Sequence, residues 1–512
     1  MIKFLQIIRE KGITPQLIAE IIDAHKDDAD RMRKLYKRYK VSVDGVPILT
    51  RKAIDYEDFE TGKMVRLDNK VNNMLNNSFD SDIVDTKVGY LFGNPITYEF
   101  DDKREAGTTS PVKQLIDDFN LRNHVADEDS EWGKMATICG QAARLAYIDK
   151  DGNERIVGID PWEVVFFTDR HIHEPEYALR YYETYNGELK AEFYDATNVH
   201  YYSTKDSSAF TEDEVKQHLF EGCPLFGLSN NKELMGDAEK VLKLIDAYDR
   251  TLSDASNEIE QYRLAYLILK GMGADEETLA KLKETGIFEL FDEKDDVKYL
   301  TKDINDALIE HHLDRLEENI LRFAKSVNFS DESFGGTVTG VAMKYKLLAL
   351  ENKCITMERK MTAALRYQYK ILFSAWSKRN KANKDEYLKV WFEFKRNLPE
   401  NILEEAQTTQ SLKGHVSERT RLSQLSFVDD VDFELKEMEE DEFRLGAKLD
   451  PLDEDDDLLD FGKENKNSDG STKKADDNRP CSVCGGSGKI PSPKTGDQIQ
   501  CTTCKGTGVR KS

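Results

Sequence analysis

The chain of 512 residues lacks the motifs by which the common nucleotide-dependent and hydrolytic enzymes are recognised. It contains no Gly-x-Ser-x-Gly elbow, no dinucleotide-binding fingerprint and no complete Walker A loop. Gly335 and Gly340 have the Walker A spacing, but Val341 and Ala342 stand where the lysine and the serine or threonine would have to be. Such a loop has neither a cationic phosphate clamp nor a hydroxyl for a metal ion. We therefore expect a chain that is not an enzyme.

Long apolar runs are also missing. No run approaches the roughly 20 residues that a membrane-spanning helix needs. The apolar stretch at the start is interrupted by Lys3 and Arg9, unlike a secretory signal. Cys139, Cys223 and Cys354 are scattered singly, as reduced structural thiols are. These features predict a cytoplasmic product with no membrane partner.

Basic patches are scarce, because the chain carries a formal net charge of -24. Residues 429–460 hold 16 Asp and Glu against three Lys and Arg, so more than half of the excess lies there. Gripping nucleic acid by counterion release requires clustered Lys and Arg. An acidic chain can still surround DNA without adhering to it.

The chain shows a mixture of helix and strand patterns that predicts an α+β protein. Residues 1–40 read as amphipathic helices, and residues 140–225 are rich in β-branched and aromatic residues between turn signals, which predicts a mixed or antiparallel β region. From 236 onward the apolar residues recur alternately four and three apart, which predicts a helix packed lengthwise against others. Those residues are Val241, Ile245, Tyr248, Leu252, Ala255, Ile259, Tyr262, Tyr266 and Leu269. A second helical pattern covers 303–327, and a third long helix begins near Gly340.

Four cysteines near the C-terminus give the most specific chemical signal. Cys481 and Cys484 form one Cys-x2-Cys pair, and Cys501 and Cys504 form a second after sixteen intervening residues. This spacing is typical of a four-thiolate zinc site. Four thiolates complete the tetrahedron around Zn²⁺ and leave no position for water, so the predicted site is structural. Both halves fit Cys-x2-Cys-x-Gly-x-Gly and resemble the zinc modules of J-domain co-chaperones.

Five stretches, in the same order, resemble the portal proteins of tailed double-stranded DNA bacteriophages, in the branch found in siphophages. They are DSDIVDTKVGYLFGNPITY at 80–98, LSNNKELMGDAEKVLKLIDAYDRTLSDASNE at 228–258, FGGTVTGVAMKYKLLALE at 334–351, KRNLPENILEEA at 395–406 and VSERTRLSQLSFVDDVDFELKEMEEDE at 416–442. The resemblance covers about 60–450. The cysteine-containing tail departs from the common pattern of the family.

The resemblance implies a portal fold with named parts. It assigns an outer wing to 1–235, stem helices to 236–270 and 303–327, a clip to 271–302, a tunnel loop to 328–339, and a long helix returning through the wing to 340–384. A mainly helical crown with an acidic tail would occupy 385–460, a flexible linker 461–479 and the zinc module 480–512. The tunnel loop would consist of Asn328, Phe329, Ser330, Asp331, Glu332, Ser333, Phe334, Gly335, Gly336, Thr337, Val338 and Thr339.

The same resemblance implies a function and partners. Subunits, usually twelve, would form a ring at one capsid vertex, through which double-stranded DNA is packaged and ejected. The partners would be other copies of the chain, the terminase large subunit, head-completion or adaptor proteins, scaffold and major capsid protein. The location would be the virion, after assembly in the host cytoplasm. Hydrolysis of ATP would belong to terminase.

Acidic side chains on the two stem helices suggest how the channel treats DNA. Carboxylates that face a bore repel phosphates and keep the duplex centred; the alternative is that they face solvent outside the ring. The candidates are Asp246, Asp249, Asp254, Glu258, Asp306, Glu310, Asp314 and Glu317.

Two other functions compete with a portal ring. The tail suggests a zinc-dependent chaperone or a scaffold or adaptor protein, although the His-Pro-Asp tripeptide that engages Hsp70 is absent. The group His171, His173 and Glu174 suggests a metal-dependent enzyme, although no further ligand lies nearby in the sequence.

Overall fold

The chain divides into two compact units, Met1–Gln407 and Thr408–Ser512, in the computed structural model. The structure describes residues 2–52, 55–57, 64–66, 71–101, 110–204, 209–262, 266–270, 296–300, 306–328, 340–398, 402–425, 427–428, 431–447, 484, 487, 489–491, 498–500 and 505.

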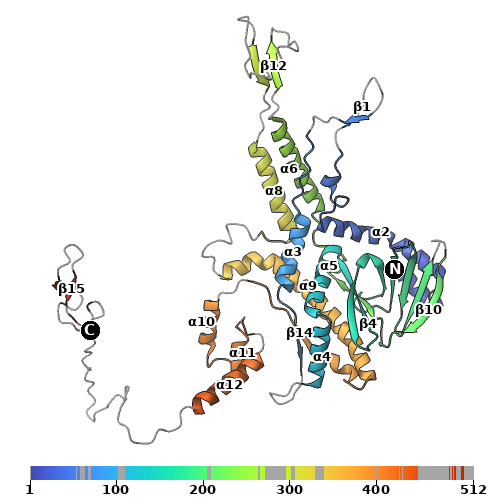
Figure 1. Ribbon diagram of the computed structural model, residues 1–512, viewed down its shortest axis with the longest axis vertical. Coiled ribbons are helices and arrows are strands. Elements are labelled where there is room, and N and C mark those ends of the chain that lie inside the picture. The colour runs from blue at the N-terminus through green and yellow to red at the C-terminus, as the bar shows by residue number, and fades with distance from the viewer. Residues whose placement is uncertain are drawn as a thin grey trace. The chain divides into compact units, whose positions relative to one another are not determined.

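The first unit combines helices with several small antiparallel sheets (Figure 1), so the predicted α+β class is confirmed. Its helices are α1 (Ile2–Lys11), α2 (Pro15–Tyr39), η1 (Pro47–Thr50), α3 (Phe79–Phe92), α4 (Pro111–Arg122), α5 (Val125–Cys139), η2 (Pro161–Glu163), α6 (Leu242–Tyr262), α8 (Asp306–Ala324), α9 (Gly340–Lys378) and η4 (Lys384–Lys389). Sequence signals mark several ends. Thr14 caps α2 by accepting a hydrogen bond from the N–H of Leu17, Pro15 occupies the first turn, and Gly140, at φ 89°, ends α5.

Two antiparallel sheets form the β region that the residue pattern predicted. One is a meander in the order β10-β9-β8-β7-β6, and the other has the order β11-β4-β5. The strands are β4 (Gln141–Ile148), β5 (Glu154–Ile159), β6 (Val164–Phe167), β7 (Tyr177–Glu183), β8 (Leu189–Tyr194), β9 (Asn198–Thr204), β10 (Thr211–Gln217) and β11 (Leu225–Ser229). Ile18 and Ile21 of α2 pack with Phe193 on one face of the meander, whereas Phe166 and Leu225 belong to a core between the two sheets.

The long helix α9 runs through the largest core of this unit. It has 39 residues, and its buried residues recur three and four apart from Leu347 to Ala364, so one stripe faces the core there. Most residues from Ala364 to Trp376 are buried, so the helix is covered on nearly all sides in that part. Trp376, Tyr369 and Phe373 are almost fully buried and pack with Phe119 of α4 and Trp132 of α5. The helix ends at Lys378, six residues before the boundary expected at 384.

The predicted stem corresponds to α6 and α8, which lie side by side (Figure 1). The expectation of one helix through residue 270 is wrong, because α6 ends at Tyr262 and Tyr266–Lys270 form strand β12. β12 pairs with β13 (Asp296–Leu300) in an antiparallel ladder. A short apolar run such as AYLIL fits a helix seam or a strand equally well. Pairing with the distant strand β13 makes this run a strand. The predicted clip segment between these strands lies outside the described residues.

The boundary expected at 385 between long helix and crown also needs correction. Strand β14 (Val390–Glu393) pairs with β3 (Thr97–Phe100), and Val390 is fully buried in the same core as α9. Residues 385–398 therefore belong to the first unit. Strand β14 has only four residues, and nothing in them indicates that they pair with a strand nearly 300 residues earlier.

The remaining elements are short. Helix α10 (Ile402–Leu412) includes the division between the units, and the second unit contains α11 (Glu418–Leu422) and α12 (Val431–Ala447). The predicted linker at 461–479 lies outside the described residues. In the tail, β15 (Lys489–Pro491) and β16 (Gln498–Gln500) form an antiparallel hairpin, and at the start of the chain β1 (Asp55–Glu57) pairs with β2 (Met64–Arg66).

Candidate functional site

A buried arginine fixes the base of the α6–α8 hairpin. Arg38, at the end of α2, is 2% exposed and donates two hydrogen bonds to Asp80 of α3, at 3.0 and 3.1 Å. Its third nitrogen donates to Asp246 of α6 at 2.8 Å. Since all five donors of a guanidinium lie in one rigid plane, this arrangement fixes three helices relative to one another.

An extended segment is bound along one face of α6. Backbone N–H groups of alternate residues donate to side-chain oxygens of helix residues four apart, at 2.6, 3.0 and 3.1 Å. The pairs are Asn73 with Asn257, Leu75 with Ser253, and Asn77 with Asp249. Two extended residues span about 6.6 Å and four helical residues about 6 Å, so the two repeats match over this length. We call residues 73–77 the strap.

A cluster of buried charges joins α3, α8 and α9 close to the start of α6. Asp237 is 8% exposed and lies 2.8 Å from the Nζ of Lys353 and 3.2 Å from that of Lys87. Burial alone would raise the pKa of Asp237, but the two ammonium groups outweigh it and lower that pKa. Lys353 also donates to the carbonyl of Ala324, at the end of α8, at 2.7 Å, and Lys87 donates to Asn230 at 2.6 Å.

A second buried network attaches α9 to the wing. Arg144 of β4 is fully buried and donates to Asp129 at 2.7 Å and to Gln368 of α9 at 2.9 Å. Its guanidinium stacks on the ring of Trp132, 4.0 Å from the centroid. Burial raises the pKa of Asp129, while the Arg144 charge opposes the shift. The long helix is therefore anchored twice, through Lys353 and through Gln368.

These anchors bracket the segment in which the tunnel loop is expected. Asn328 is the one expected loop residue that the structure describes, and its side-chain amide donates to Glu317 at 3.3 Å. Residues 329–339 lie outside the described residues. Lys353 binds the end of α8, and Gln368 of α9 binds Arg144 of β4, so both sides of the segment are attached to the first unit.

Comparison with known proteins decides the family. Residues 18–444 match the family described as phage portal protein, SPP1 Gp6-like. The chain belongs to the phage portal protein family. It is also 26% identical to the portal protein of Bacillus phage SPP1 over 86% of this chain and 90% of that protein. It is 24% identical to the portal protein of Clostridium phage phiCD119 over 70% of this chain and 83% of the relative.

The family assignment favours the portal function over the chaperone or scaffold alternative. Members of this family are structural proteins, and that assignment supports the expectation that the chain is not an enzyme. The match ends at residue 444, so the cysteine-containing tail lies beyond it. No helix in the described part of the chain is long and apolar enough to cross a membrane.

The structure sorts the eight carboxylates that were expected to line a portal bore. Asp249 is 1% exposed and accepts from the strap, so this buried carboxylate does not face a bore, whereas Asp246 is partly buried and pairs with Arg38. Burial raises the pKa of Asp249, and the hydrogen bonds from Asn77 lower it. The heptad pattern could not show this, because it does not reveal what covers the remaining faces of a helix.

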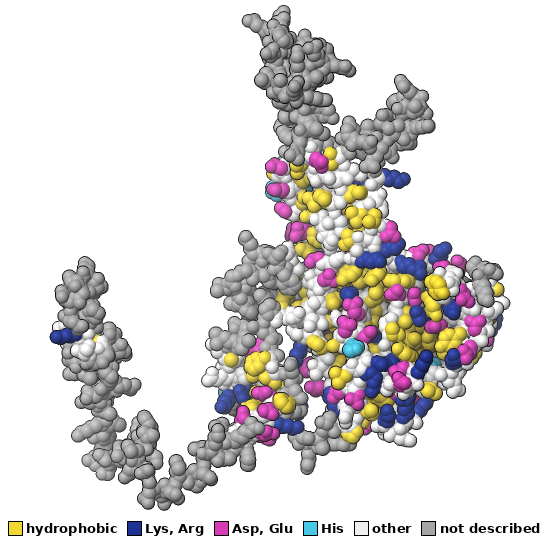
Figure 2. All heavy atoms as spheres, viewed as in Figure 1, with side chains coloured by type: hydrophobic (Ala, Val, Ile, Leu, Met, Phe, Trp, Pro, Cys, Tyr) yellow, Lys and Arg dark blue, Asp and Glu magenta, His cyan; other side chains and the backbone are white. Residues whose placement is uncertain are grey.

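The other six carboxylates differ in exposure. Asp254 pairs with Arg51 at 2.6 Å, Glu317 accepts from Asn328, and Glu258 is half-buried. Besides Asp254, the exposed carboxylates of this group are three along α8: Asp306, Glu310 and Asp314. Figure 2 shows acidic side chains along the α8 edge of the hairpin.

Of the predicted zinc ligands, Cys484 is described and is partly buried, whereas Cys481, Cys501 and Cys504 lie outside the described residues. Of the hairpin between the two cysteine pairs, the strands β15 and β16 are described. Its register pairs Lys489 with Gln500, five residues after Cys484 and one before Cys501.

The histidines of the wing do not gather further metal ligands. The rings of His171 and His173 stack at 5.1 Å between centroids, and Glu174 pairs with Lys370 of α9 at 2.5 Å. Burial, and secondarily His171, lowers the pKa of His173 to about 4. Among the described residues no group of three or more His, Cys, Asp or Glu is arranged to hold a metal ion.

Sequence reasoning missed the residues that hold the hairpin and α9 in place. The stripe Asp249, Ser253 and Asn257 is polar at a spacing of four within an otherwise apolar heptad pattern, which was a visible signal. Lys353 and Lys87 gave no sequence signal of their burial, because an isolated lysine in a helix is ordinarily exposed.

Proposed function

We propose that copies of this chain assemble into a ring at one vertex of a phage capsid, and that viral double-stranded DNA is packaged and ejected through its axial channel. The family match over residues 18–444 carries this proposal. The paired helices α6 and α8 support it, since an exposed two-helix hairpin is suited to packing against copies of itself. We further propose twelve subunits, and terminase large subunit, head-completion or adaptor proteins, scaffold and major capsid protein as partners.

The most direct functional test uses phage in which this gene carries a stop codon. We expect DNA-filled heads to be lost and to return when the intact chain is supplied in trans. Filled heads at the normal yield in the absence of the chain would contradict the proposal. Electron microscopy of thin sections and measurement of nuclease-protected DNA both give the result.

Residues 328–339 are proposed to form a loop that faces the channel. Gly335 and Gly336 permit backbone conformations that other residues resist. The contacts of Lys353 and Gln368 fix the two flanking helices, α8 and α9. A Gly336→Pro substitution should reduce DNA filling and spare ring assembly, with Gly336→Ala as the milder control. Normal filling with the proline variant would count against this role.

The exposed carboxylates at the start of α8, Asp306 and Glu310, are the groups that we propose to repel DNA phosphates in the channel. A passage for sliding DNA benefits from the absence of strong phosphate anchors. Replacing both residues by lysine should slow packaging, and this effect should weaken as salt is raised because exposed charges are screened.

The tail is proposed to bind one structural Zn²⁺ through Cys481, Cys484, Cys501 and Cys504. The hairpin register supports this, because it pairs residues close in sequence to both cysteine pairs. We expect about one zinc per chain, lost when Cys481 and Cys504 are both replaced by serine. Equal metal content in that variant and in the unaltered chain would refute the site.

A further inference from the structure

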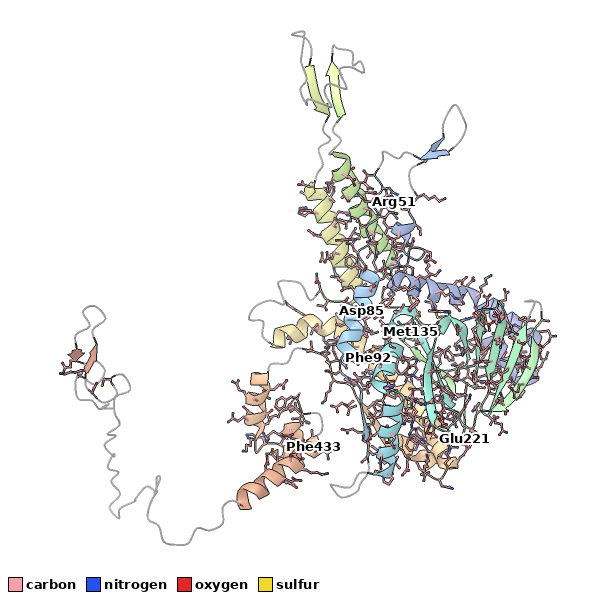
Figure 3. All side chains as sticks on the ribbon, in the orientation of Figure 1. Arg51, Asp85, Phe92, Met135, Glu221 and Phe433 are labelled. Carbon is pink, nitrogen blue, oxygen red and sulfur yellow. The ribbon has the colours of Figure 1, made fainter. Side chains whose placement is uncertain are left out.

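The edge of α6 that faces away from α8 carries basic side chains, of which Arg51 and Lys243 pair with acidic residues of α6. Figure 3 places Arg51 at this edge, and Arg51 pairs with Asp254. Residues four apart are neighbours on one helix face, so the exposed Arg250 shares the edge with Asp254. Lys243, whose side chain is 98% exposed, lies two turns nearer the start of the helix.

Several acidic residues of α6 have partners within this chain. Asp246 pairs with Arg38 and, at 3.9 Å, with Lys243, and Asp254 pairs with Arg51. Asp249 and Glu260 accept hydrogen bonds from Asn77 and Asn73. Within the described part of the chain, no ion pair engages Arg250. A guanidinium is thus left exposed on the outer edge of the hairpin.

The outer face of α8 carries the opposite charge. Leu316 is buried toward α6, and residues two before and two after it point away by roughly 200° of helical rotation. Those residues are Asp314 and Glu318, both exposed. Glu318 lies 3.8 Å from Arg315, whereas no ion pair engages Asp314 among the described residues.

Arg250 and Asp314 lie at nearly the same height along the hairpin. Ile245 and Ile320 belong to one core cluster, which aligns these two levels. The two helices run in opposite directions. Arg250 lies five residues after Ile245, and Asp314 lies six residues before Ile320, so the heights of Arg250 and Asp314 differ by about one residue, or 1.5 Å. Burial raises the pKa of Tyr248, and the nearby charges of Glu317 and Asp314 add to that shift, in agreement with this alignment.

We propose that Arg250 of one copy pairs with Asp314 of the next copy around the ring, with Glu318 on the other side of the same guanidinium. This inference rests on the proposed ring. The rotation that generates a closed ring moves no residue along the ring axis. If the hairpin runs nearly parallel to that axis, residues at equal heights on its two edges meet between neighbouring copies. An exposed guanidinium on one edge and an exposed carboxylate on the other suit a head-to-tail contact between copies.

Charge reversal in the full-length protein tests the pairing. Arg250→Glu and Asp314→Arg are compared singly and together, with Lys150→Glu, an exposed lysine in the β4–β5 turn, as the matched control. Mass photometry over a concentration series gives the concentration at which half of the chains are in rings. Each single reversal should raise it at least about tenfold, because it places like charges together. The combined swap should return it to near the unaltered value, and the control should not change it.

The outcomes separate this pairing from the ring itself. Rings that form equally well with either single reversal, or that the combined swap fails to restore while circular dichroism shows a folded chain, overturn the pairing and leave the ring standing. Unaltered assembly with reduced DNA passage in Asp314→Arg places that carboxylate in the bore instead. Absence of rings from the unaltered protein overturns both proposals.

Discussion

Lys353, in the middle of α9, donates a hydrogen bond to the carbonyl of Ala324 at the end of α8, at 2.7 Å. The two residues are separated in sequence by the expected tunnel loop. The same ammonium group lies 2.8 Å from Asp237, near the start of α6. One side chain therefore contacts the segments where the chain enters α6 and leaves α8. The side chain of Lys353 thus joins α9 to the α6–α8 hairpin at this point.

Replacing Lys353 by Met should destabilise this junction. Asp237 would keep Lys87 but lose its closer partner, and the carbonyl of Ala324 would lose its donor. We expect a loss of about 1–3 kcal/mol in the free energy of unfolding. Urea denaturation measures it, with the exposed Lys381→Met as the control, which should change stability by less than about 0.5 kcal/mol. Equal stability of the two variants would show that the junction contributes nothing.

The strap predicts an alternating pattern of amide protection. The N–H groups of residues 73, 75 and 77 are bonded to α6, whereas no hydrogen bond engages those of 74 and 76 among the described residues. Hydrogen exchange resolved to single residues should be slower at the three odd positions. Ser253→Ala should raise exchange at residue 75 most. Uniform exchange across 73–77 would contradict the arrangement.

Two carboxylates of the stem should respond differently to neutralisation. Asp246 shares the buried guanidinium of Arg38, so Asp246→Asn should lower the free energy of unfolding by about 1–3 kcal/mol. Glu310 is exposed, and Glu310→Gln should change it by less than about 0.5 kcal/mol. Denaturation curves of both variants give these free energies of unfolding. A larger loss in Glu310→Gln than in Asp246→Asn would contradict the prediction.

Acid should weaken the contact between α2 and the five-stranded sheet through His25. Burial lowers the pKa of His25 from 6.5 to about 4, and its ring is hydrogen-bonded to the Tyr181 hydroxyl at 2.8 Å. Below pH 6.5 His25 is protonated in the unfolded chain, whereas in the folded chain it is protonated only below about pH 4. Stability is therefore complete above pH 6.5 and falls as the pH drops toward 4, by up to roughly 3 kcal/mol.

The variant His25→Gln keeps a partner for Tyr181 and removes this titration. Its unfolding free energy should fall less between pH 7 and pH 4.5 than that of the unaltered chain. Parallel pH dependence in the two proteins would assign the acid sensitivity to other groups.

Much of the fold was readable from residue patterns, and the limits have physical causes. The apolar period of α6 and α8 and the β-branched strands of the wing identify their elements because burial imposes a regular spacing. The end of α6 at Tyr262 and the strand at Val390 depend on pairing with residues far away in sequence. The burial of Asp249 and Lys353 depends on which segments cover them, and no local pattern encodes that.

Electron microscopy of the purified full-length chain tests the central claim most directly. The account predicts closed rings with an axial hole and one fixed number of subunits, twelve by our proposal. Monomers or dimers at every protein and salt concentration would contradict it.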